Sequence, residues 1–553
     1  MSGTRPDGRA PSTPSVHRRH HLRLGRQGGS MHHVPRTTTR IALILVTITA
    51  VLLAGLALAQ ERRFVVAQSS SVNSWDPPAD WASEAEWIVM NTYDCLVFPD
   101  RETGEVVGWL AESWELLDEV TWRLNLRQGV TFHNGDPFTA EDAAFSIDRI
   151  LAASRQEFIV FDQWQFVERT EVVDDHTLDI VTRNPDPAFL SRLSGTGCGV
   201  VNKSYVEEFG NEHLANNAMG TGPFVVVDYD RASFVRMVAN DDYWGGRPEI
   251  DELIFRAIPE SSTRVAELLT GGVDLALSVL PQDWARIENT DNLSMLHYTT
   301  DRVWGLTVAH APAASVDAVA TSIPEVREAI NLAIDREELN DLVGGFGVPT
   351  LTRLTPPIPC YDRVADQLYD VNPFDPERAR ELLASVGYPD VPGAELTLHS
   401  AQGQGVAHRD IAETVASMLE DVGFIVRLDI RDLTNFRETV YQDNPGGIML
   451  QTLGNFTTDP WLFVLNYDSQ FETRSMPRNR FSDEMLDTMA VQIATEMDPD
   501  ARCDLVAEYA LRVREINASV ELLHQPESLG IRADVSWTPP TDGKFMMLNV
   551  SYR

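Results

Sequence analysis

Residues 111–150 constrain the fold of this chain more than any other part of its sequence. Trp122, Leu124 and Leu126 alternate with polar neighbours, which is the period of a strand with one buried face. A second short strand is predicted at residues 130–132. The first half of the segment therefore predicts β-structure with one face against a core.

The second half of the same segment predicts a turn and then a helix. Asn134 and Gly135 both tolerate positive φ, so they favour a tight turn. Thr139 can accept a hydrogen bond from a free N–H at a helix start, and Asp142 suits the positive end of the helix dipole. The apolar side chains that follow share roughly one helical face: Ala143, Ala144, Ile147, Ile150 and Leu151.

In its order of residues, this segment resembles the signature of the family 5 solute-binding proteins, which serve ABC importers of peptides, nickel and related solutes. The shared pattern is AESW…W.L.LR.GV.FH.G.PF.AED..FS..R. An arbitrary strand, turn and helix is the alternative explanation, but the pattern is too long and too unusual to favour it.

Three further segments carry the same resemblance. Residues 220–276 contain GTGP, NDDYWGGRPEIDELIF and GGVDLA, which are similar to a second characteristic stretch of the family. Residues 324–343 are similar to its VR.A.N.AIDRE helix, and residues 374–388 to its DPE.A..LL..AGY helix. The resemblance therefore covers most of residues 62–525.

Periodicity and turn residues predict further elements along the chain. Strands are expected at residues 63–72, 224–229, 234–238 and 250–258, a hairpin at 170–182, and closing strands at 535–537 and 546–550. Helices are expected at residues 82–97, 261–270, 324–343 with a fresh cap at Asp335, and 374–388. The resemblance to the family implies a helix followed by a strand at residues 412–429.

The resemblance implies the fold: an α/β protein with two lobes, the periplasmic-binding-protein fold, mixed sheets and a ligand cleft between the lobes. The first lobe would span residues 61–300, with an inserted subdomain at about 84–200. The second lobe would span residues 305–525, and residues 526–553 would return to the first lobe. The two resulting crossings form a hinge that can open and close around a solute.

Residues 1–60 are predicted to be a leader and not part of the fold. Residues 1–40 carry eight Arg and one acid, and residues 41–59 are uncharged and apolar, ending in Ala-Leu-Ala. These features are typical of a secretory signal that is cleaved near Ala59, which places the mature protein in the periplasm. A retained membrane anchor is the alternative, since the apolar run is long enough to span a bilayer. Met31 is an alternative start.

The charge of the chain excludes some partners. The whole sequence has a net charge of −37, and the leader is positive, so the remaining chain is more acidic still. Such a surface repels nucleic acid and anionic lipid headgroups. The charge does not identify the ligand, because the acids are spread along the sequence.

The chain has four cysteines, Cys95, Cys198, Cys360 and Cys503. In an oxidising compartment an even number permits disulfides, with three possible pairings that the sequence cannot separate. Buried free thiols are the alternative. No cysteine or histidine pair has the spacing of metal ligands, so neither a metal nor a cofactor is expected.

Enzyme motifs are missing from the sequence. It contains no GxxxxGK[ST], GxSxG or HExxH. Adjacent carboxylates such as Asp174-Asp175 and Asp241-Asp242 are interpreted as solvated turns of an acidic chain. An acid pair of the glycosidase kind is the remote alternative, because residue types alone do not exclude it.

The resemblance also suggests where the first lobe meets the ligand. In the family, the loop after the first DP turn faces the cleft, which corresponds here to Asp80, Trp81 and Ser83. Trp81 offers a rigid surface for stacking on a ligand, although packing between strand and helix is an equal alternative. Trp304 follows the first predicted crossing at residues 298–304, where an aromatic side chain would line the cleft.

The second lobe contributes residues 451–460, which resemble the GW…D..DP segment of the family. In peptide-binding members, the Asp three residues before DP binds the α-amino group of the peptide. An ungapped match places Phe456 there, and a phenyl ring offers only a cation–π face in place of a carboxylate. Asp459 is interpreted as a helix cap before Trp461. The predicted ligand-binding residues of this segment are Gly454, Asn455, Phe456, Thr457 and Asp459.

The sequence thus predicts a secreted, monomeric solute-binding component of an ABC import system. It would capture a peptide or similar solute and deliver it to a permease and ATPase complex at the inner membrane, without making or breaking a bond. Phe456 favours a solute that lacks a free amine, such as an oligosaccharide, as the main alternative. A ligand carrier for a chemoreceptor and, remotely, an extracellular hydrolase are the others.

Overall fold

The fold is given by a computed structural model. It describes residues 62–553 except 80–82, 101–103, 155–156, 159, 311–318, 357, 369–372, 402–406, 437–438, 441–446, 455–456, 468–481 and 541–544. The predicted leader and its cleavage point near Ala59 lie outside the described residues. Among the described residues, no helix has the length and apolar character needed to cross a membrane.

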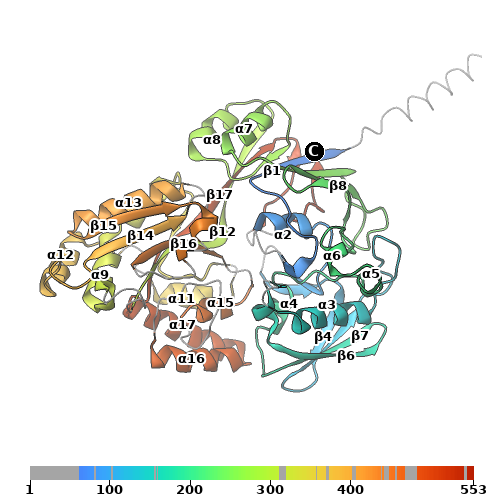
Figure 1. The fold of residues 1–553 in the computed structure, drawn as a ribbon, viewed down its shortest axis with the longest axis horizontal. Coiled ribbons are helices and arrows are strands. Elements are labelled where there is room, and N and C mark those ends of the chain that lie inside the picture. The colour runs from blue at the N-terminus through green and yellow to red at the C-terminus, as the bar shows by residue number, and fades with distance from the viewer. Residues whose placement is uncertain are drawn as a thin grey trace, which may run out of the picture. The chain divides into compact units, whose positions relative to one another are not determined.

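Eleven strands of the described chain form one mixed sheet (Figure 1). Its order is β15-β14-β16-β12-β17-β11-β1-β10-β9-β8, and β13 (Val348–Pro349) pairs with β17. One half contains β14 (Glu395–Ala401), β15 (Ile425–Arg431) and β16 (Ile448–Gly454). The other half contains β1 (Arg63–Gln68), β8 (Phe224–Asp230), β9 (Phe234–Ala239), β10 (Glu252–Ala257) and β11 (Leu275–Ala276). Parallel pairs occur in both halves, which confirms the predicted mixed α/β class.

Two long central strands join the halves of the sheet: β12 (Leu293–Val308) and β17 (Ser519–Arg532). They run antiparallel, and their pairing is interrupted. Thr299 pairs with Pro526, but the next pair is Val303 with His524. Residues 300–302 therefore form a bulge in β12, and a bulge bends the strand and redirects its side chains.

The first lobe also contains a four-stranded antiparallel sheet with the order β4-β5-β7-β6. It is built from β4 (Ala111–Leu116), β5 (Thr121–Leu126), β6 (Val167–Asp174) and β7 (Thr177–Thr182), beside α3 (Ala140–Ala152). Thr139 and Asp142 form a capping box, in which the backbone N–H of Thr139 donates to Asp142 Oδ2 at 2.9 Å. Four side chains of the predicted helical face are buried: Ala143, Ala144, Ile147 and Ile150. The predicted helix is therefore confirmed as α3.

The remaining elements of the first lobe surround these two sheets. The short strands are β2 (Val97–Pro99), β3 (Val106–Gly108), β18 (Val535–Ser536) and β19 (Ser551–Tyr552). The helices are η1 (Pro77–Ala79), α2 (Ser83–Val89), η2 (Phe161–Trp164), α4 (Phe189–Leu193), α5 (Lys203–Phe209), α6 (Asn211–Leu214), α7 (Ser261–Leu269) and α8 (Pro281–Glu288).

Two predicted strands are wrong. Residues 130–132 form only an isolated bridge, Thr131 to Pro137, because the chain turns at Gly135 with φ +89° before a ladder can extend. The last strand is β19, not residues 546–550, because those residues place buried side chains in the first-lobe core.

The predicted helix at residues 82–97 is also too long, because α2 ends at Val89. Asn91 lies just beyond that end and is fully buried. Its side-chain amide donates to the backbone oxygens of Trp87 and Phe545, and its Oδ1 accepts from the N–H of Met547. These bonds to a distant part of the chain fix a turn where the helical pattern would continue.

The second lobe packs helices on both faces of its half of the sheet (Figure 1). On one face lie α9 (Pro324–Ala333), α10 (Arg336–Asp341), α12 (Pro376–Ser385) and α13 (His408–Asp421), with η3 (Ala320–Ser322). The other helices are α11 (Tyr361–Gln367), α14 (Leu433–Phe436), α15 (Trp461–Leu465), α16 (Glu484–Thr495) and α17 (Pro499–Glu515). The predicted cap at Asp335 is confirmed, since its side chain accepts from the N–H groups of Glu337 and Glu338.

All four cysteines form disulfides: Cys95 with Cys198, and Cys360 with Cys503. The first pair lies in the core of the first lobe, beside α3, and the second joins the start of α11 to α17 in the second lobe. The structure thus selects one of the three pairings that the sequence left open.

Candidate functional site

Several predicted ligand-binding residues are not among the residues that the structure describes. Asp80, Trp81, Asn455 and Phe456 lie outside the described residues, and Ser83 begins α2 without a described side chain. Their role in binding stays a prediction. The parts of the site that are described are the crossing strands and the segment from Thr457 to Trp461.

Trp304 lies on β12 with its side chain fully buried in the main hydrophobic cluster of the second lobe. It packs there with residues of β14, β16 and α9. In this structure Trp304 contributes to a core, and its predicted contact with the ligand is untested.

The segment after β16 is fixed by a buried ion pair. Asp459 accepts from both terminal nitrogens of Arg502 on α17, at 2.6 and 2.8 Å, and both side chains are buried. Asp459 Oδ1 also accepts from the backbone N–H of Trp461 at 2.7 Å. The predicted capping role of Asp459 is therefore confirmed, and its pairing with Arg502 explains why this turn holds one conformation.

This segment contacts α4 of the first lobe. Ser191 Oγ donates to the backbone oxygen of Thr458 at 3.1 Å and lies 3.2 Å from its hydroxyl. The guanidinium of Arg192 lies 4.4 Å from the ring centroid of Trp461. We call these four residues the lobe contact, because they join the two lobes away from the crossing strands.

A second charged residue supports the lobe contact from within the first lobe. Arg192 lies 3.3 Å from the carboxylate of Asp186, and both groups are largely buried. Burial raises the pKa of Asp186, although Arg192 acts in the opposite direction. Burial likewise lowers the pKa of Arg192. Both charges are thus held with little water, which strengthens the cation–π interaction of Arg192 with the Trp461 ring.

The bulge of β12 lies next to the end of β16. A Cβ built on Gly454 would lie 3.3 Å from Arg302 Cγ and 3.8 Å from Asp301 Oδ1. The hydroxyl of Thr300 donates to the backbone oxygen of Gln525 at 2.9 Å and fastens the bulge to β17. Asp301 and Arg302 therefore lie where both crossing strands meet the predicted ligand segment.

Sequence reasoning missed most of these contacts. It placed Asp301 and Arg302 within the first crossing but gave them no role, and it did not single out Ser191 or Arg192. Thr457 was predicted, and its side-chain oxygen is buried without a hydrogen-bond partner among the described residues. A pattern within one segment cannot reveal a bulge or a contact that depends on another segment.

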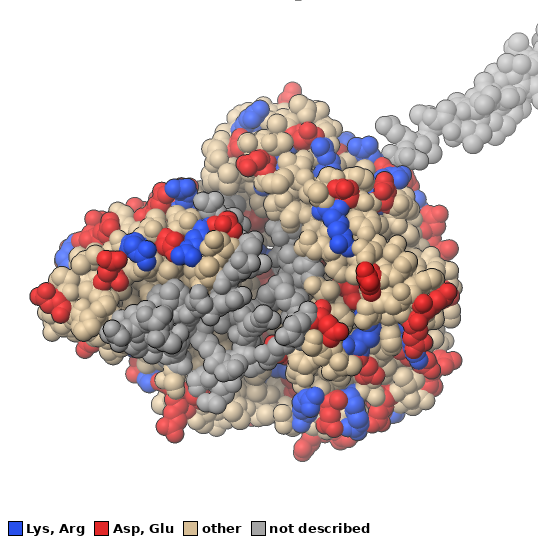
Figure 2. Space-filling view, in the orientation of Figure 1, with Lys and Arg blue, Asp and Glu red and all other residues tan. Residues whose placement is uncertain are grey.

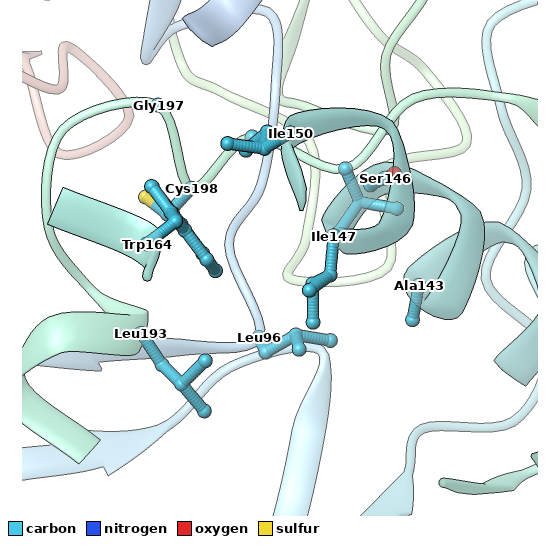
Figure 3. A pocket seen from close by; sticks show the side chains of 11 residues that line it. Leu96, Ala143, Ser146, Ile147, Ile150, Trp164, Leu193, Gly197 and Cys198 are labelled. Carbon is cyan, nitrogen blue, oxygen red and sulfur yellow. The ribbon is translucent and has the colours of Figure 1, made fainter. Parts of the chain in front are cut away.

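A small cavity lies in the first lobe, lined by residues other than the predicted ligand-binding ones (Figure 3). Its volume is about 10 Å³, which is roughly the room for one water. Leu96, Ile147, Trp164 and Leu193 line it with other core residues, as Figure 3 shows. It is too small for a solute and belongs to the packing of α3.

The described residues contain no candidate metal site, and the face drawn in Figure 2 carries acidic and basic side chains together. Among them, no group of three or more acidic, His or Cys side chains could hold a metal ion. Figure 2 shows acidic and basic side chains interspersed over the visible face, in keeping with the scattered charge of the sequence. The predicted turn carboxylates Asp174, Asp175, Asp241 and Asp242 are exposed, as expected.

Comparison with known families supports this two-lobed architecture. The family described as bacterial extracellular solute-binding proteins, family 5 Middle, matches residues 105–474. This chain belongs to the family 5 solute-binding proteins. The resemblance inferred from residues 111–150 is therefore confirmed.

Individual relatives within the family differ in what their names say they bind. Heme-binding protein A of Haemophilus influenzae is 32% identical over 320 residues, which are 54% of this chain and 57% of that protein. The chain thus spans little more than half of this relative. Glutathione-binding protein GsiB of Escherichia coli is 27% identical over 402 residues, which are 72% of this chain and 75% of that protein.

A solved structure shows the same fold. The periplasmic binding protein DppA from Helicobacter pylori, in complex with the peptide STSA, superposes with a TM-score of 0.75 at 21% sequence identity. The match covers 89% of this chain and 98% of that chain. The predicted two-lobed periplasmic-binding-protein fold is confirmed.

Proposed function

We propose that this family 5 protein is the solute-binding component of an ABC import system and that its solute is a short peptide or a peptide-like molecule. The protein captures the solute between its lobes and delivers it to a membrane permease with its ATPase. It makes and breaks no bond. Polar groups near the hinge give selectivity, and aromatic side chains give contact area.

One observation carries this proposal most directly. Two strands cross between the lobes, a bulge turns Asp301 and Arg302 towards the end of β16, and Ser191 meets Thr458 at a second place. A fold that is joined at one place and touches at another can close around a solute. The names of GsiB and of the DppA complex, glutathione and peptide, agree with the proposed solute class.

A non-peptide solute is the second candidate, and the identity of residue 456 favours it. The matched segment carries Phe456 where a peptide-binding member would carry the carboxylate for the α-amino group. Heme-binding protein A is a relative named for a ligand without an amine-bearing backbone. The two candidates differ in whether the solute has a free ammonium group.

The test is to identify and then measure the solute. The exported protein is denatured, the released molecules are identified by mass spectrometry, and thermal unfolding is followed with glutathione, trialanine, hemin and an oligosaccharide mixture. We expect a rise in Tm with peptides and no turnover of them. A rise with hemin or sugars alone would overturn the peptide class, and hydrolysis of a probe would favour the enzyme alternative.

The compartment and the lobe boundaries complete the proposal. We place the mature protein in the periplasm as a monomer, after removal of residues 1–60, with lobes at residues 61–300 plus 526–553 and at 305–525. The N-terminal residue of the secreted protein tests the predicted cleavage near Ala59. A mature chain that still begins at Met1 or Met31 would favour the membrane-anchor alternative.

A further inference from the structure

Gln525 and Glu527 form a pair of unsatisfied acceptors on the second crossing strand. Side chains two residues apart in a strand point to the same face, so these two share one face of β17. Gln525 is 2% exposed and Glu527 is 9% exposed. The Oε1 atom of each side chain is buried and has no hydrogen-bond partner among the described residues.

This acceptor pair lies at the place where a binding site is expected in such a sheet. Ser278 is the second residue after β11, and its side chain and backbone hydrogen-bond the carboxylate of Glu527. β11 and β10 are parallel to β1, so their carboxyl ends lie at one edge, and ligands of open α/β sheets bind at that edge. Opposite the pair is the bulge of residues 300–302, which is fastened to Gln525 through Thr300.

The chemistry of the pair selects one kind of ligand group. A buried acceptor without a donor is costly, and both free atoms are acceptors. An ammonium group carries three donors and a positive charge, so it can satisfy a carboxylate and an amide oxygen together. Arg302 is the charged side chain that acts on the Glu527 carboxylate, and the buried Oε1 atoms of the pair stay available to a donor.

We propose that Gln525 and Glu527 bind the ammonium group of the solute. The inference rests on the proposed function and names a feature of its solute, a free amine. It also accounts for Phe456, because the ammonium is held by the hinge strand and not by the second-lobe segment. Burial raises the pKa of the Glu527 carboxyl, and an incoming cation stabilises its ionised form.

The experiment compares trialanine with N-acetyl-trialanine by calorimetry on the exported protein and on Glu527→Gln, which keeps the shape of the side chain. We expect wild type to bind the free peptide more tightly than the capped one. In Glu527→Gln the free peptide should bind at least about 10-fold more weakly and the capped peptide should change little. Gln525→Leu should show a smaller loss in the same direction.

Ser528→Ala is the matched control on the same strand. Its side chain lies on the opposite face of β17, where its hydroxyl lies 2.8 Å from His297 Nδ1. This variant should keep the wild-type preference for the free peptide. The thermal unfolding of all three variants without solute separates a folding defect from a loss of binding.

The outcomes separate this inference from the proposed function. Peptides that bind Glu527→Gln as tightly as wild type overturn the inference and leave the proposed function standing. If no peptide binds, the proposed solute class fails, and the solute released on denaturation is treated with an amine-reactive reagent. A released solute with a reactive amine then supports the inference, and a solute without one, or no released solute, overturns it.

Discussion

The two lobes meet at two places that are built in different ways. At the hinge, β12 and β17 pair on both sides of the bulge and carry the backbone from one lobe to the other. At the lobe contact, Ser191 and Arg192 meet Thr458 and Trp461 through hydrogen bonds to one residue and one cation–π interaction. The first junction is continuous chain, and the second is a small set of side-chain contacts that a solute can favour or oppose.

The hinge also has a cluster of three aromatic rings packed on one another, whereas the lobe contact uses the Trp461 ring in a cation–π interaction with Arg192. Trp284 of α8, His297 of β12 and Phe346, which precedes β13, have ring centroids 3.9 to 5.4 Å apart. This cluster joins a first-lobe helix to a second-lobe loop beside the crossing strands. The comparison therefore predicts that damage at the hinge, or at the ion pair inside the second lobe, affects stability. Loss of a side-chain contact between Ser191 or Arg192 and the other lobe should affect closure around the solute.

The largest effect should come from the ion pair behind the lobe contact. Asp459→Ala leaves Arg502 buried without its carboxylate and removes the cap of α15, so we expect a loss of about 3–5 kcal/mol in the free energy of unfolding. Urea denaturation measures it. Replacing both residues by Leu should recover most of the loss, because no buried charge is then left alone. A single variant that loses less than about 1 kcal/mol would contradict the pairing.

The next largest effect is the loss of folding stability at acidic pH that comes from the buried His524 on β17. Burial lowers the pKa of His524 to about 4 in the folded protein, below the unfolded value near 6.5. The unfolded chain therefore takes up this proton first, so the stabilisation is complete above pH 6.5 and is lost as the pH falls towards 4. The loss is about 1.4 kcal/mol per pH unit at most.

His524→Gln should remove this part of the pH dependence, as measured by urea denaturation between pH 7 and pH 4. Ser191→Ala at the lobe contact introduces no titrating group and should keep the wild-type slope. Equal slopes for wild type and His524→Gln would show that this histidine does not act in the acid response of the hinge.

A smaller effect is expected where the second-lobe loop packs on the aromatic cluster. Gly344 has φ +70°, and an added Cβ would lie 2.3 Å from Cζ3 of Trp284. Gly344→Ala should therefore cost about 1–3 kcal/mol through overpacking and backbone strain. Gly345→Ala is the matched control, since Gly345 has φ +77° with no atom within 4 Å of an added Cβ. Thermal unfolding should show a lower Tm for Gly344→Ala than for Gly345→Ala. An equal loss of stability in the two variants would exclude the contact with Trp284.

The smallest effect should come from the lobe contact itself. Ser191→Ala removes the hydrogen bonds to Thr458, and a net loss of about 1 kcal/mol should raise the Kd for the solute roughly 5-fold. The free energy of unfolding without solute should change little. Calorimetry with trialanine measures the Kd, and Ser204→Ala on α5 is the control. A loss of stability as large as that of Asp459→Ala would remove the distinction between the two junctions.

Local sequence patterns predicted much of the fold because the responsible interactions are local. The capping box of α3 needs only Thr139 and Asp142, three residues apart. The predictions failed where a distant segment decides. Asn91 ends α2 by bonding Phe545 and Met547, and nothing near residue 91 reveals those partners.

The candidate site was harder to predict for the same reason. The position of Asp459 before Trp461 is enough to predict a cap, but its partner Arg502 lies on α17, far along the chain. The acceptor pair depends on a register shift between β12 and β17, which is a property of two strands and not of either sequence alone. The contact of Ser191 with Thr458 spans 267 residues of chain and has no signature in either segment.

The two disulfides have a consequence for how the molecule can move. Each ties together segments more than one hundred residues apart, and each does so inside a single lobe. The disulfides thus stabilise each lobe internally, and neither of them links one lobe to the other, so they do not restrict the angle between the lobes. Oxidising conditions should therefore increase resistance to unfolding without slowing the binding or the dissociation of the solute.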